Sequence, residues 1–266
     1  MKVSVLILTQ NNQDFIENCL KSVKDWAEEI VVIDAGSTDK TLAICQLYHC
    51  QIYHHPWPGF AQQRTLAAQK AKNDWIFYLD VDERLTTKLK QEINNLVPDK
   101  AAYQLKRENI ILGKWLKQGG WYPDKQTRLI NKQYFKGWQG RIHEYPLLEG
   151  EQGQLQAAII HLTHRGINWS LDKTMIYTDH VAQLLYEAPH PRCRWWHLTL
   201  AFFREFWQRG IVKRGLFEGM EGFITVIYQS FDAFIAYAKL WELQKKRTMG
   251  KVYQQIDKEL LEKGEY

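Results

Sequence analysis

The order of apolar and polar segments in the N-terminal part of the chain predicts strands that alternate with helices. Short apolar runs, typical of strands buried on both faces, alternate with segments whose apolar residues are spaced three or four apart, as in helices. The predicted strands cover residues 3–8, 30–33, 51–54 and 75–79, and the predicted helices cover residues 15–26, 41–48, 61–71 and 86–96. Asn12 or Asp14 can cap the first of these helices. This alternation predicts a doubly wound α/β sheet, whose ligands bind beyond the carboxyl ends of the strands.

The pattern changes after residue 100. Three further strands are predicted at residues 103–111, 127–130 and 157–162, with a long loop rich in Gly and Trp between the first two. Loops of that length in a compact domain usually bind something. From about Asn168 the chain is helical, with breaks predicted at Pro189, Pro191, Gly210 and Gly215. We therefore predict an α/β domain over residues 1–167 and a helical, basic and aromatic-rich extension over residues 168–266.

The apolar segments indicate neither a membrane span nor a signal peptide. The longest apolar helical stretch, residues 222–241, contains polar and charged residues, whereas a spanning helix needs about 20 predominantly apolar residues with few or no charges. The alternative that this stretch forms an amphipathic helix, which lies on a bilayer or against the core, is left open. Residues 1–9 run into Gln10 without a cleavage site, so they predict a first strand. The four cysteines show no C-x-x-C spacing and are expected to be reduced thiols of a cytoplasmic protein.

Positive charge and aromatic residues gather in one part of the chain. Its 266 residues include 35 Lys and Arg against 30 Asp and Glu, a net charge of +5. Residues 190–216 hold six basic residues and one acidic residue, so the remainder is neutral overall. This segment suits a surface that meets an anionic and partly apolar partner, such as an anionic membrane surface. Alternatively, Phe202, Phe203, Phe206 and Trp207 are core residues beneath solvated arginines, and both interpretations can hold on opposite faces of the same helices. No nucleic-acid-binding module surrounds the segment, so no nucleic-acid partner is expected.

Three polar clusters follow the predicted strands, at residues 9–12, 34–39 and 80–83. Because the carboxyl ends of parallel strands meet at one edge of a sheet, we expect these clusters to converge. Asp80 and Asp82 follow a predicted strand and have one residue between them. One of them can hold a divalent cation while the other reaches a sugar hydroxyl or a water on the cation.

The cluster at residues 34–39 has the sequence D-A-G-S-T-D. Asp34 can accept a hydrogen bond from a nucleobase N–H, and Gly36 permits a tight turn with close approach of a ligand. Asp39 is expected to cap the helix that opens at Thr41. Capping does not explain Asp34, which stands at a strand end.

Residues 5–12, the D-x-G-S-T-D run and the D-x-D at residues 80–82, in this order and at these separations, resemble the nucleotide-sugar-binding core of glycosyltransferase family 2. The resemblance implies a GT-A type α/β sandwich, a nucleoside-diphosphate sugar donor, Mn²⁺ or Mg²⁺ as cofactor, and inversion at the anomeric carbon. Processive polysaccharide synthases of this family carry a Q-x-x-R-W signature, which this sequence lacks. Transfer of a single sugar is therefore expected.

Further segments are similar to the lipopolysaccharide and lipooligosaccharide core β-1,4-glucosyltransferases of that family, and the similarity covers about residues 1–245. They are residues 59–64, 75–83, 121–129, 140–144 and 237–242. Ala35 and Thr65 depart from the pattern and leave the donor preference open. The similarity implies transfer of glucose from UDP-glucose to a heptose of the inner core, a lipid-linked acceptor, at the inner face of the inner membrane. The alternatives are a polyprenyl-phosphate or capsule-type sugar transferase and a non-catalytic nucleotide-sugar-binding protein.

Carried onto this sequence, the resemblance assigns a role to five side chains. Thr9 and Asp34 hold the uracil and ribose end of the donor, and Arg64 approaches the nucleotide or its diphosphate. Asp80 contacts the ribose or the metal, and Asp82 ligates the metal.

Inverting transfer also needs a base that takes the proton of the acceptor hydroxyl. Glu144 is the predicted base and Asp124 the second candidate, although Glu144 could instead be a surface carboxylate paired with Arg141 or His143. His161, at the end of a predicted strand, could be a third metal ligand or a hydrogen-bonded side chain.

Overall fold

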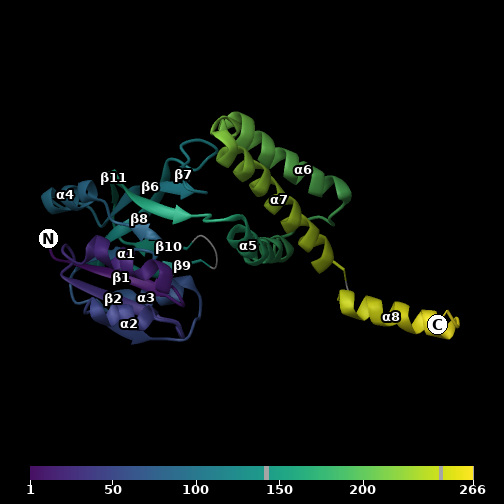
Figure 1. The fold of residues 1–266 in the computed structure, drawn as a ribbon, viewed down its shortest axis with the longest axis horizontal. Coiled ribbons are helices and arrows are strands. Elements are labelled where there is room, and N and C mark those ends of the chain that lie inside the picture. Colours follow the sequence, from purple (N-terminus) through teal and green to yellow (C-terminus); the bar gives the residue numbers. More distant parts are fainter. Residues whose placement is uncertain (141–143, 246–247, 266) are drawn as a thin grey trace. The chain divides into compact units, whose positions relative to one another are not determined.

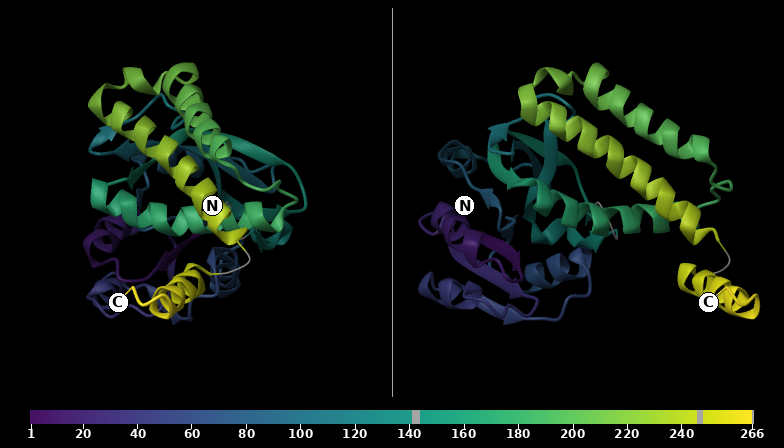
Figure 2. Two further views of the ribbon diagram at one scale, coloured as in Figure 1. Left: turned by 90° about the vertical axis from the view of Figure 1, so that its right-hand side faces the viewer. Right: turned by 45° about the vertical axis from the view of Figure 1, so that its right-hand side comes forward.

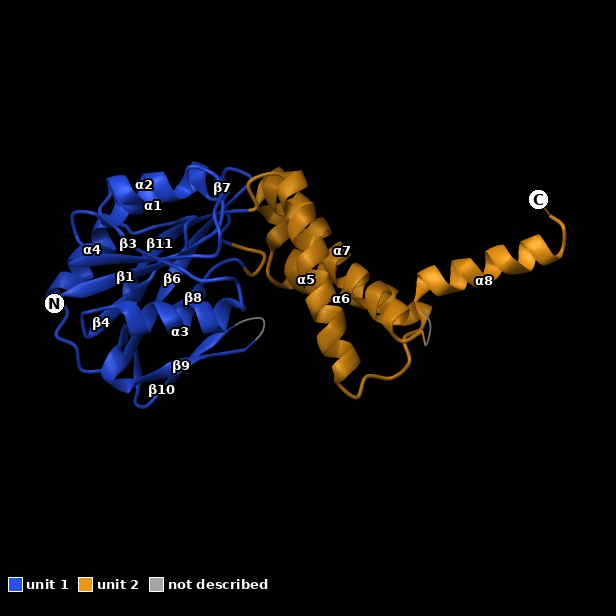
Figure 3. Ribbon diagram, turned by 90° about the horizontal axis from the view of Figure 1, so that it is seen from below, with its two compact units in different colours: residues 1–117, 121–163 blue, residues 118–120, 164–266 orange. Residues whose placement is uncertain are grey.

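The computed structural model describes residues 1–140, 144–245 and 248–265 (Figure 1). The chain forms two compact units (Figure 3). The first comprises residues 1–117 and 121–163, and the second comprises residues 118–120 and 164–266. The main chain thus passes from one unit to the other between Thr163 and His164, a few residues before the predicted boundary.

Strands and helices alternate along the N-terminal part of the first unit. These elements are β1 (Val3–Thr9), α1 (Gln13–Val23), β2 (Glu29–Asp34), α2 (Thr41–Leu47), β3 (Gln51–His54), α3 (Phe60–Lys70), β4 (Trp75–Tyr78), β5 (Glu83–Arg84) and α4 (Thr87–Asn95). The remaining elements are β6 (Ala102–Ile111), β7 (Lys114–Trp115), β8 (Asp124–Asn131), η1 (Lys132–Tyr134), β9 (Phe135–Gln139), β10 (Tyr145–Leu148) and β11 (Gln152–Thr163). The predicted alternation is confirmed.

Nine strands of the described chain form one mixed sheet. Their order is β3-β2-β1-β4-β8-β6-β11-β5, and β7 pairs with β6. Strands β3, β2, β1 and β4 are parallel, whereas β8 is antiparallel to both of its neighbours. Thr9 and Asp34 are partners in the register of β1 and β2. Two of the predicted site residues therefore end adjacent strands.

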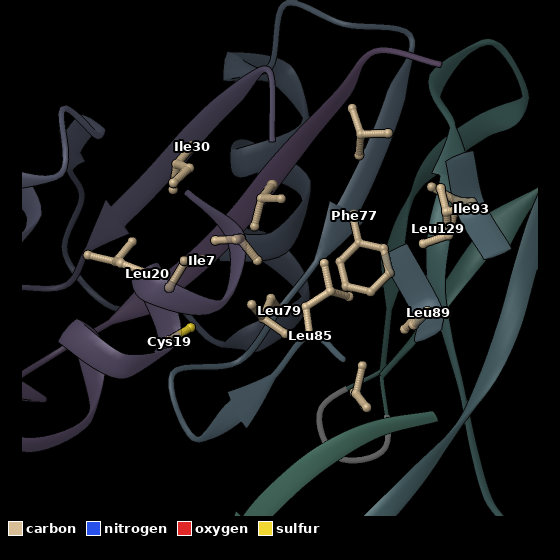
Figure 4. Close-up of a cluster of buried hydrophobic side chains, with 14 of the residues drawn as sticks. Ile7, Cys19, Leu20, Ile30, Phe77, Leu79, Leu85, Leu89, Ile93 and Leu129 are labelled. Carbon is tan, nitrogen blue, oxygen red and sulfur yellow. The ribbon is translucent and has the colours of Figure 1, made fainter. Parts of the chain in front are cut away.

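Alternate residues of the central strands face two hydrophobic layers. Val5 and Ile7 of β1 pack in a layer with α1, α2 and α4, whereas Leu6 packs with α3 on the other face. Figure 4 shows the first layer, in which Ile7, Phe77 and Leu89 come from three different elements. Each such side chain stabilises the fold by about 1.5–3 kcal/mol on full burial. The packed layers hold the strand ends, and thus the polar clusters, in place.

The hairpin β9–β10 was not predicted from the sequence, where no strands were expected in this segment. The β9 sequence F-K-G-W-Q lacks a regular alternation of apolar and polar residues, so its periodicity gives no strand signal. The hairpin is held instead by contacts with α3. The N–H of Trp138 donates to the Thr65 hydroxyl at 2.9 Å, and Gly137 lies against the same side chain. Thr65, noted as a departure from the family pattern, thus supports the hairpin.

The second unit is helical, as predicted. It contains α5 (Ile167–Glu187), α6 (Trp195–Glu205), the π-helical segment η2 (Phe206–Val212), η3 (Gly215–Phe217), α7 (Gly219–Leu243) and α8 (Met249–Glu262). Helices α6 and α7 lie side by side (Figure 2). Gly210, a predicted break, lies inside η2 instead, because the helix continues there with wider turns. Among the described helices, none is both long enough and apolar enough to cross a bilayer.

Candidate active site

The run at residues 34–39 folds into a tight turn around its first carboxylate. Asp34 is 1% exposed, and its carboxylate accepts hydrogen bonds from the backbone N–H groups of Gly36 at 2.9 Å and Ser37 at 3.0 Å. The Ser37 hydroxyl donates a further one. Burial alone would raise the pKa of Asp34, but the hydrogen bonds from Ser37 and Gly36 outweigh it and lower the pKa below its ordinary value. Asp34 is therefore an ionised group that holds the shape of the turn.

This turn is hydrogen-bonded to the loop that follows β1. The N–H of Asn11 donates to the Ser37 hydroxyl at 2.9 Å, and the side-chain oxygen of Asn11 accepts from the N–H of Thr38 at 2.8 Å. Asp39 accepts from the N–H of Thr41 at 2.9 Å, which confirms its predicted role at the start of α2. The first two polar clusters therefore meet at one edge of the sheet, as expected.

Asp80, just after β4, lies between two arginines. Its Oδ1 accepts from Arg64 Nη2 at 2.9 Å, and its Oδ2 accepts from Arg128 Nη2 at 2.7 Å. Burial would raise the pKa of Asp80, yet the charges of Arg128 and Arg64 hold the pKa well below its usual range. Two fixed positive charges at these oxygens disfavour a divalent cation at the same place. Asp80 therefore suits the role of orienting the arginines better than that of a metal ligand.

Arg64 joins Asp80 to the predicted base. Arg64 is buried on α3, and its Nε donates to Oε1 of Glu144 at 3.1 Å. Its guanidinium also lies over the rings of Trp138 and Tyr78, at 5.3 Å and 5.6 Å from the ring centres. The other carboxylate oxygen of Glu144, Oε2, accepts no hydrogen bond from the described residues. The structure thus brings Arg64, Asp80 and Glu144 together, and within the described residues only Oε1 of Glu144 has a hydrogen-bond donor.

Part of the segment around the predicted base cannot be compared with the prediction. Residues 141–143 lie outside the described residues, and so does the predicted alternative in which Glu144 pairs with Arg141 or His143. In the described part, the partner of Glu144 is Arg64, whose sequence separation from it is 80 residues.

A chain of alternating charges continues from Asp80 to Asp124. Arg128 also donates to the fully buried Glu83, and Arg107 lies between Glu83, at 3.6 Å, and Asp124, at 2.7 Å. Burial would raise the pKa of Asp124, but the charge of Arg107 and further hydrogen bonds lower it. Both carboxylate oxygens of Asp124 accept hydrogen bonds. Asp124 is therefore more fully engaged than Glu144.

The sequence analysis gave no role to Glu83, Arg107 or Arg128. The signal that could have found Arg107 is its place on the face of β6 that also carries the buried apolar side chains of Tyr103, Leu105 and Ile111. The pairing itself depends on the register of β6 with β8, which joins distant parts of the chain and has no local signal.

A second group of side chains centres on Asn109, which is buried near the C-terminal end of β6. Its Nδ2 donates to Asp124 at 3.1 Å and to the backbone oxygen of Trp121 at 2.9 Å. Its Oδ1 therefore faces Nδ1 of His161, at 2.7 Å, and accepts a hydrogen bond from it. In the neutral imidazole this places the lone pair on Nε2, which lies 3.6 Å from Oδ1 of Asp82.

Asp82 and His161 fit a divalent cation. Carboxylates and neutral imidazoles both bind divalent metal ions such as Mn²⁺. A metal-binding histidine is usually oriented by a hydrogen bond at its second ring nitrogen. No group of three or more His, Cys, Asp and Glu side chains placed to hold a metal occurs in the described parts of the chain. Mg²⁺ is commonly bound by one or two protein ligands together with substrate phosphates and water. The two side chains suit that kind of site.

The fold and this edge of the sheet define the class of protein. The structure resembles that of the mannosyltransferase PcManGT from Pyrobaculum calidifontis, solved with GDP-Man and Mn²⁺, with a TM-score of 0.55 over 92% of this chain and 88% of that one, at 13% identity. The chain is 29% identical to an uncharacterized glycosyltransferase of Rickettsia bellii, over 91% of this chain and 87% of the relative. The protein is a glycosyltransferase with the GT-A type α/β fold, as predicted.

Two further findings give the family. Residues 4–147, more than half of the chain, match the family model described as glycosyl transferase family 2. The chain belongs to glycosyltransferase family 2. It is also 25% identical to the lipopolysaccharide core biosynthesis glycosyltransferase LpsC of Rhizobium meliloti, over 91% of this chain and 93% of that protein.

Proposed function

We propose that the protein is an inverting, metal-dependent glycosyltransferase that moves one glucose from UDP-glucose to a heptose of the lipopolysaccharide or lipooligosaccharide inner core. The observation that carries the proposal is the grouping of Arg64, Asp80 and Glu144 with the pair Asp82 and His161 at one edge of the sheet. The expected place of action is the inner face of the inner membrane.

The nucleotide sugar binds beyond the ends of β1 and β2. There Thr9 and Asp34 hold the uracil and ribose end of the donor, and the half-buried Ser37 with the exposed Thr38 meets the nucleoside. Arg64 faces the diphosphate, and Asp82 with His161 holds the cation. When bound, a divalent cation stabilises the negative charge that grows on the departing UDP.

Glu144 acts as the base. The acceptor oxygen forms a bond to the anomeric carbon, the bond from that carbon to the diphosphate oxygen breaks, and the hydroxyl proton passes to Oε2 of Glu144. Oε1 stays hydrogen-bonded to Arg64, which orients the carboxylate. UDP leaves with the electron pair of the broken bond, and the configuration at the anomeric carbon is inverted.

The test of the base compares two isosteric variants. We expect Glu144→Gln to lower kcat by about 10²–10⁴, the usual contribution of general-base catalysis, while donor binding is retained. Asp124→Asn should lower kcat far less, and the exposed control Glu151→Gln should behave as wild type. The reverse order of the first two variants would move the base to Asp124.

The metal and donor are tested by thermal melting. UDP-glucose with Mn²⁺ should raise the melting temperature of the wild-type protein, because a ligand that binds the folded state stabilises it. Asp82→Ala should abolish the rise that requires Mn²⁺. An unchanged melting temperature of the wild type across a set of UDP- and GDP-sugars would contradict the assignment of a nucleotide-sugar donor.

The acceptor is inferred from the similarity to core glucosyltransferases and from the name of the Rhizobium relative. Transfer of labelled glucose to a heptose-containing core lipid, compared with polyprenyl phosphate, separates the proposed acceptor from the alternative. Mass spectrometry of the product shows whether one sugar is added. Transfer to polyprenyl phosphate alone would overturn the acceptor and leave the donor and base assignments standing.

A further inference from the structure

The second unit exposes a row of large apolar side chains on one face of α6 and η2. Leu200, Phe203 and Trp207 are 63%, 63% and 61% exposed, and Trp196 and Ile211 continue the row at both ends. Their spacing of three or four residues places all five on one side of the helix. We call these five residues the outer face of α6. Burial of this face against a partner would stabilise the complex by the hydrophobic free energy of several large side chains.

The opposite side of α6 is packed. Ala201 is buried, and Phe202 and Phe206 are half-buried; the ring of Phe202 lies 5.4 Å from that of Phe231 on α7. Phe202, which packs on α7, agrees with the core interpretation, whereas the exposed side chains of Phe203 and Trp207 contradict it. The outer face is therefore not needed for the packing of the unit.

Small and hydroxyl-bearing residues make part of the contacts between α5 and α7, beside the ion pair of Lys239 with Asp179. Ser170, Thr174 and Thr178, four residues apart on α5, are buried, and the Thr174 hydroxyl donates to Asp232 of α7 at 2.7 Å. Several large apolar side chains of these helices are exposed, among them Leu171, Met175, Ile176 and Phe223, whereas Val226 and Leu240 of α7 are buried.

The exposed charged residues between positions 190 and 216 are all basic. Arg192, Arg194, Arg204, Lys213 and Arg214 are exposed. The one acidic residue of this segment, Glu205, is paired with Arg209. Exposed arginines next to tryptophans are typical of helices in the headgroup region of a bilayer, where basic side chains meet anionic lipids.

Two other partners fit this surface less well. In a symmetric dimer the same patch meets itself, so the arginines of both copies would face each other, which is unfavourable. A nucleic acid would neutralise the arginines but leave the aliphatic side chains of Leu200 and Ile211 exposed to water. An anionic bilayer satisfies both the charges and the apolar row.

We propose that the outer face of α6 is a membrane-docking surface, which enters the headgroup region of an anionic phospholipid bilayer with the helix parallel to the membrane plane. Arg192, Arg194, Arg204, Lys213 and Arg214 bind the phosphates beside it. This inference deepens the proposed membrane location and does not depend on which sugar is transferred.

The test is flotation of the full chain with phospholipid vesicles. We expect the wild type to float with vesicles of phosphatidylcholine and phosphatidylglycerol, and to bind pure phosphatidylcholine much less. The double variant Leu200→Glu, Phe203→Glu should bind the anionic vesicles with an affinity at least about tenfold lower, because two inserting side chains are replaced by anions. Replacing Arg192, Arg194 and Arg204 by Gln should weaken binding to anionic vesicles and reduce its salt dependence, because Lys213 and Arg214 remain.

The matched control is Leu47→Glu, which replaces an exposed leucine of α2 in the first unit. Its vesicle binding should equal that of the wild type. Unfolding curves verify that every variant is folded, and the nucleotide-sugar-dependent rise in melting temperature should be the same in all of them. Failure of the donor assignment would remove that rise without affecting flotation.

Three results would overturn the proposal. The wild type could fail to bind anionic vesicles, or the double variant could bind them as the wild type does. Light scattering could also show a wild-type dimer that Leu200→Glu, Phe203→Glu dissociates, which would make the outer face an interface between two copies of the chain.

Discussion

At the residue scale, Asp34 stabilises the fold only while it is ionised. Its pKa is lowered in the folded state, so its contribution is present above the unfolded pKa of about 3.9 and is lost as the pH falls through the folded pKa. Asn resembles a protonated Asp in shape. We therefore expect Asp34→Asn to be less stable than the wild type at pH 6, with a difference that shrinks towards zero as the pH falls below about 4.

Urea unfolding at a series of pH values measures this difference. Asp25→Asn serves as the control because Asp25 is largely exposed and has only a loose ion pair with Lys24, at 3.8 Å. A stability difference for Asp34→Asn that stayed constant from pH 6 to low pH would mean that the ionised carboxylate is not what holds the turn.

Asn109 has an effect on the proposed metal site without touching the metal. It accepts from Nδ1 of His161 and donates to Asp124, so it fixes the ring that faces Asp82. Loss of such a supporting hydrogen bond typically lowers metal affinity by about 10–100-fold. We expect this loss in Asn109→Ala, measured by calorimetric titration of Mn²⁺ in the presence of UDP, with the exposed Asn95→Ala as control. Equal Mn²⁺ affinity in Asn109→Ala and wild type would remove His161 from the site.

At the scale of elements, the turn between α6 and α7 depends on close backbone contacts. A Cβ on Gly222 of α7 would lie 2.4 Å from the backbone oxygen of Gly215, too close for the chain to accept without moving. A Cβ on Gly250 of α8 meets nothing within 4 Å. We expect Gly222→Ala to lower the free energy of unfolding by about 1–3 kcal/mol, the usual cost of overpacking.

Gly250→Ala is the matched control, since both glycines lie in the first turns of their helices. Helix α8 buries none of its residues, so a change there should alter the free energy of global unfolding by less than about 0.5 kcal/mol. Urea unfolding of both variants measures the contrast. Equal stability of the two would show that the turn can move away from α7.

How far the sequence predicts these elements depends on the range of the interactions that form them. The strand-end positions of Thr9 and Asp34 follow from local apolar runs and from the parallel order that alternating helices impose. The links from Arg64 to Glu144 and from Arg128 to Asp80 depend instead on which distant strands and loops become neighbours. Sequence patterns therefore located the edge of the site, whereas its charge network required the tertiary structure.

The outer face of α6 also could not be predicted from the sequence pattern alone. The basic and aromatic composition of residues 190–216 predicted a surface for an anionic partner, but composition could not divide its aromatic side chains between core and solvent. The aromatic side chains at positions 202, 203, 206 and 207 can be divided between core and solvent only when the helix is placed against α7, which covers Phe202 and leaves Phe203 exposed. The division of the aromatic side chains between core and solvent therefore limits the proposed membrane-docking surface to the five residues of the outer face of α6.

At the scale of the whole molecule, docking should matter for transfer only when the acceptor is itself in the membrane. Binding of the second unit to the bilayer that carries the acceptor raises the local concentration of acceptor at the enzyme. For a heptose acceptor in anionic vesicles, we expect Leu200→Glu, Phe203→Glu to lower kcat/KM by about tenfold or more. For a short water-soluble acceptor fragment, the same variant should match the wild type, because the catalytic residues lie in the first unit and are unchanged. Leu47→Glu should match the wild type with both acceptors. An equal loss of kcat/KM with both acceptors would show that the outer face of α6 supports the catalytic unit directly. No loss with either acceptor would show that membrane binding does not contribute to acceptor capture.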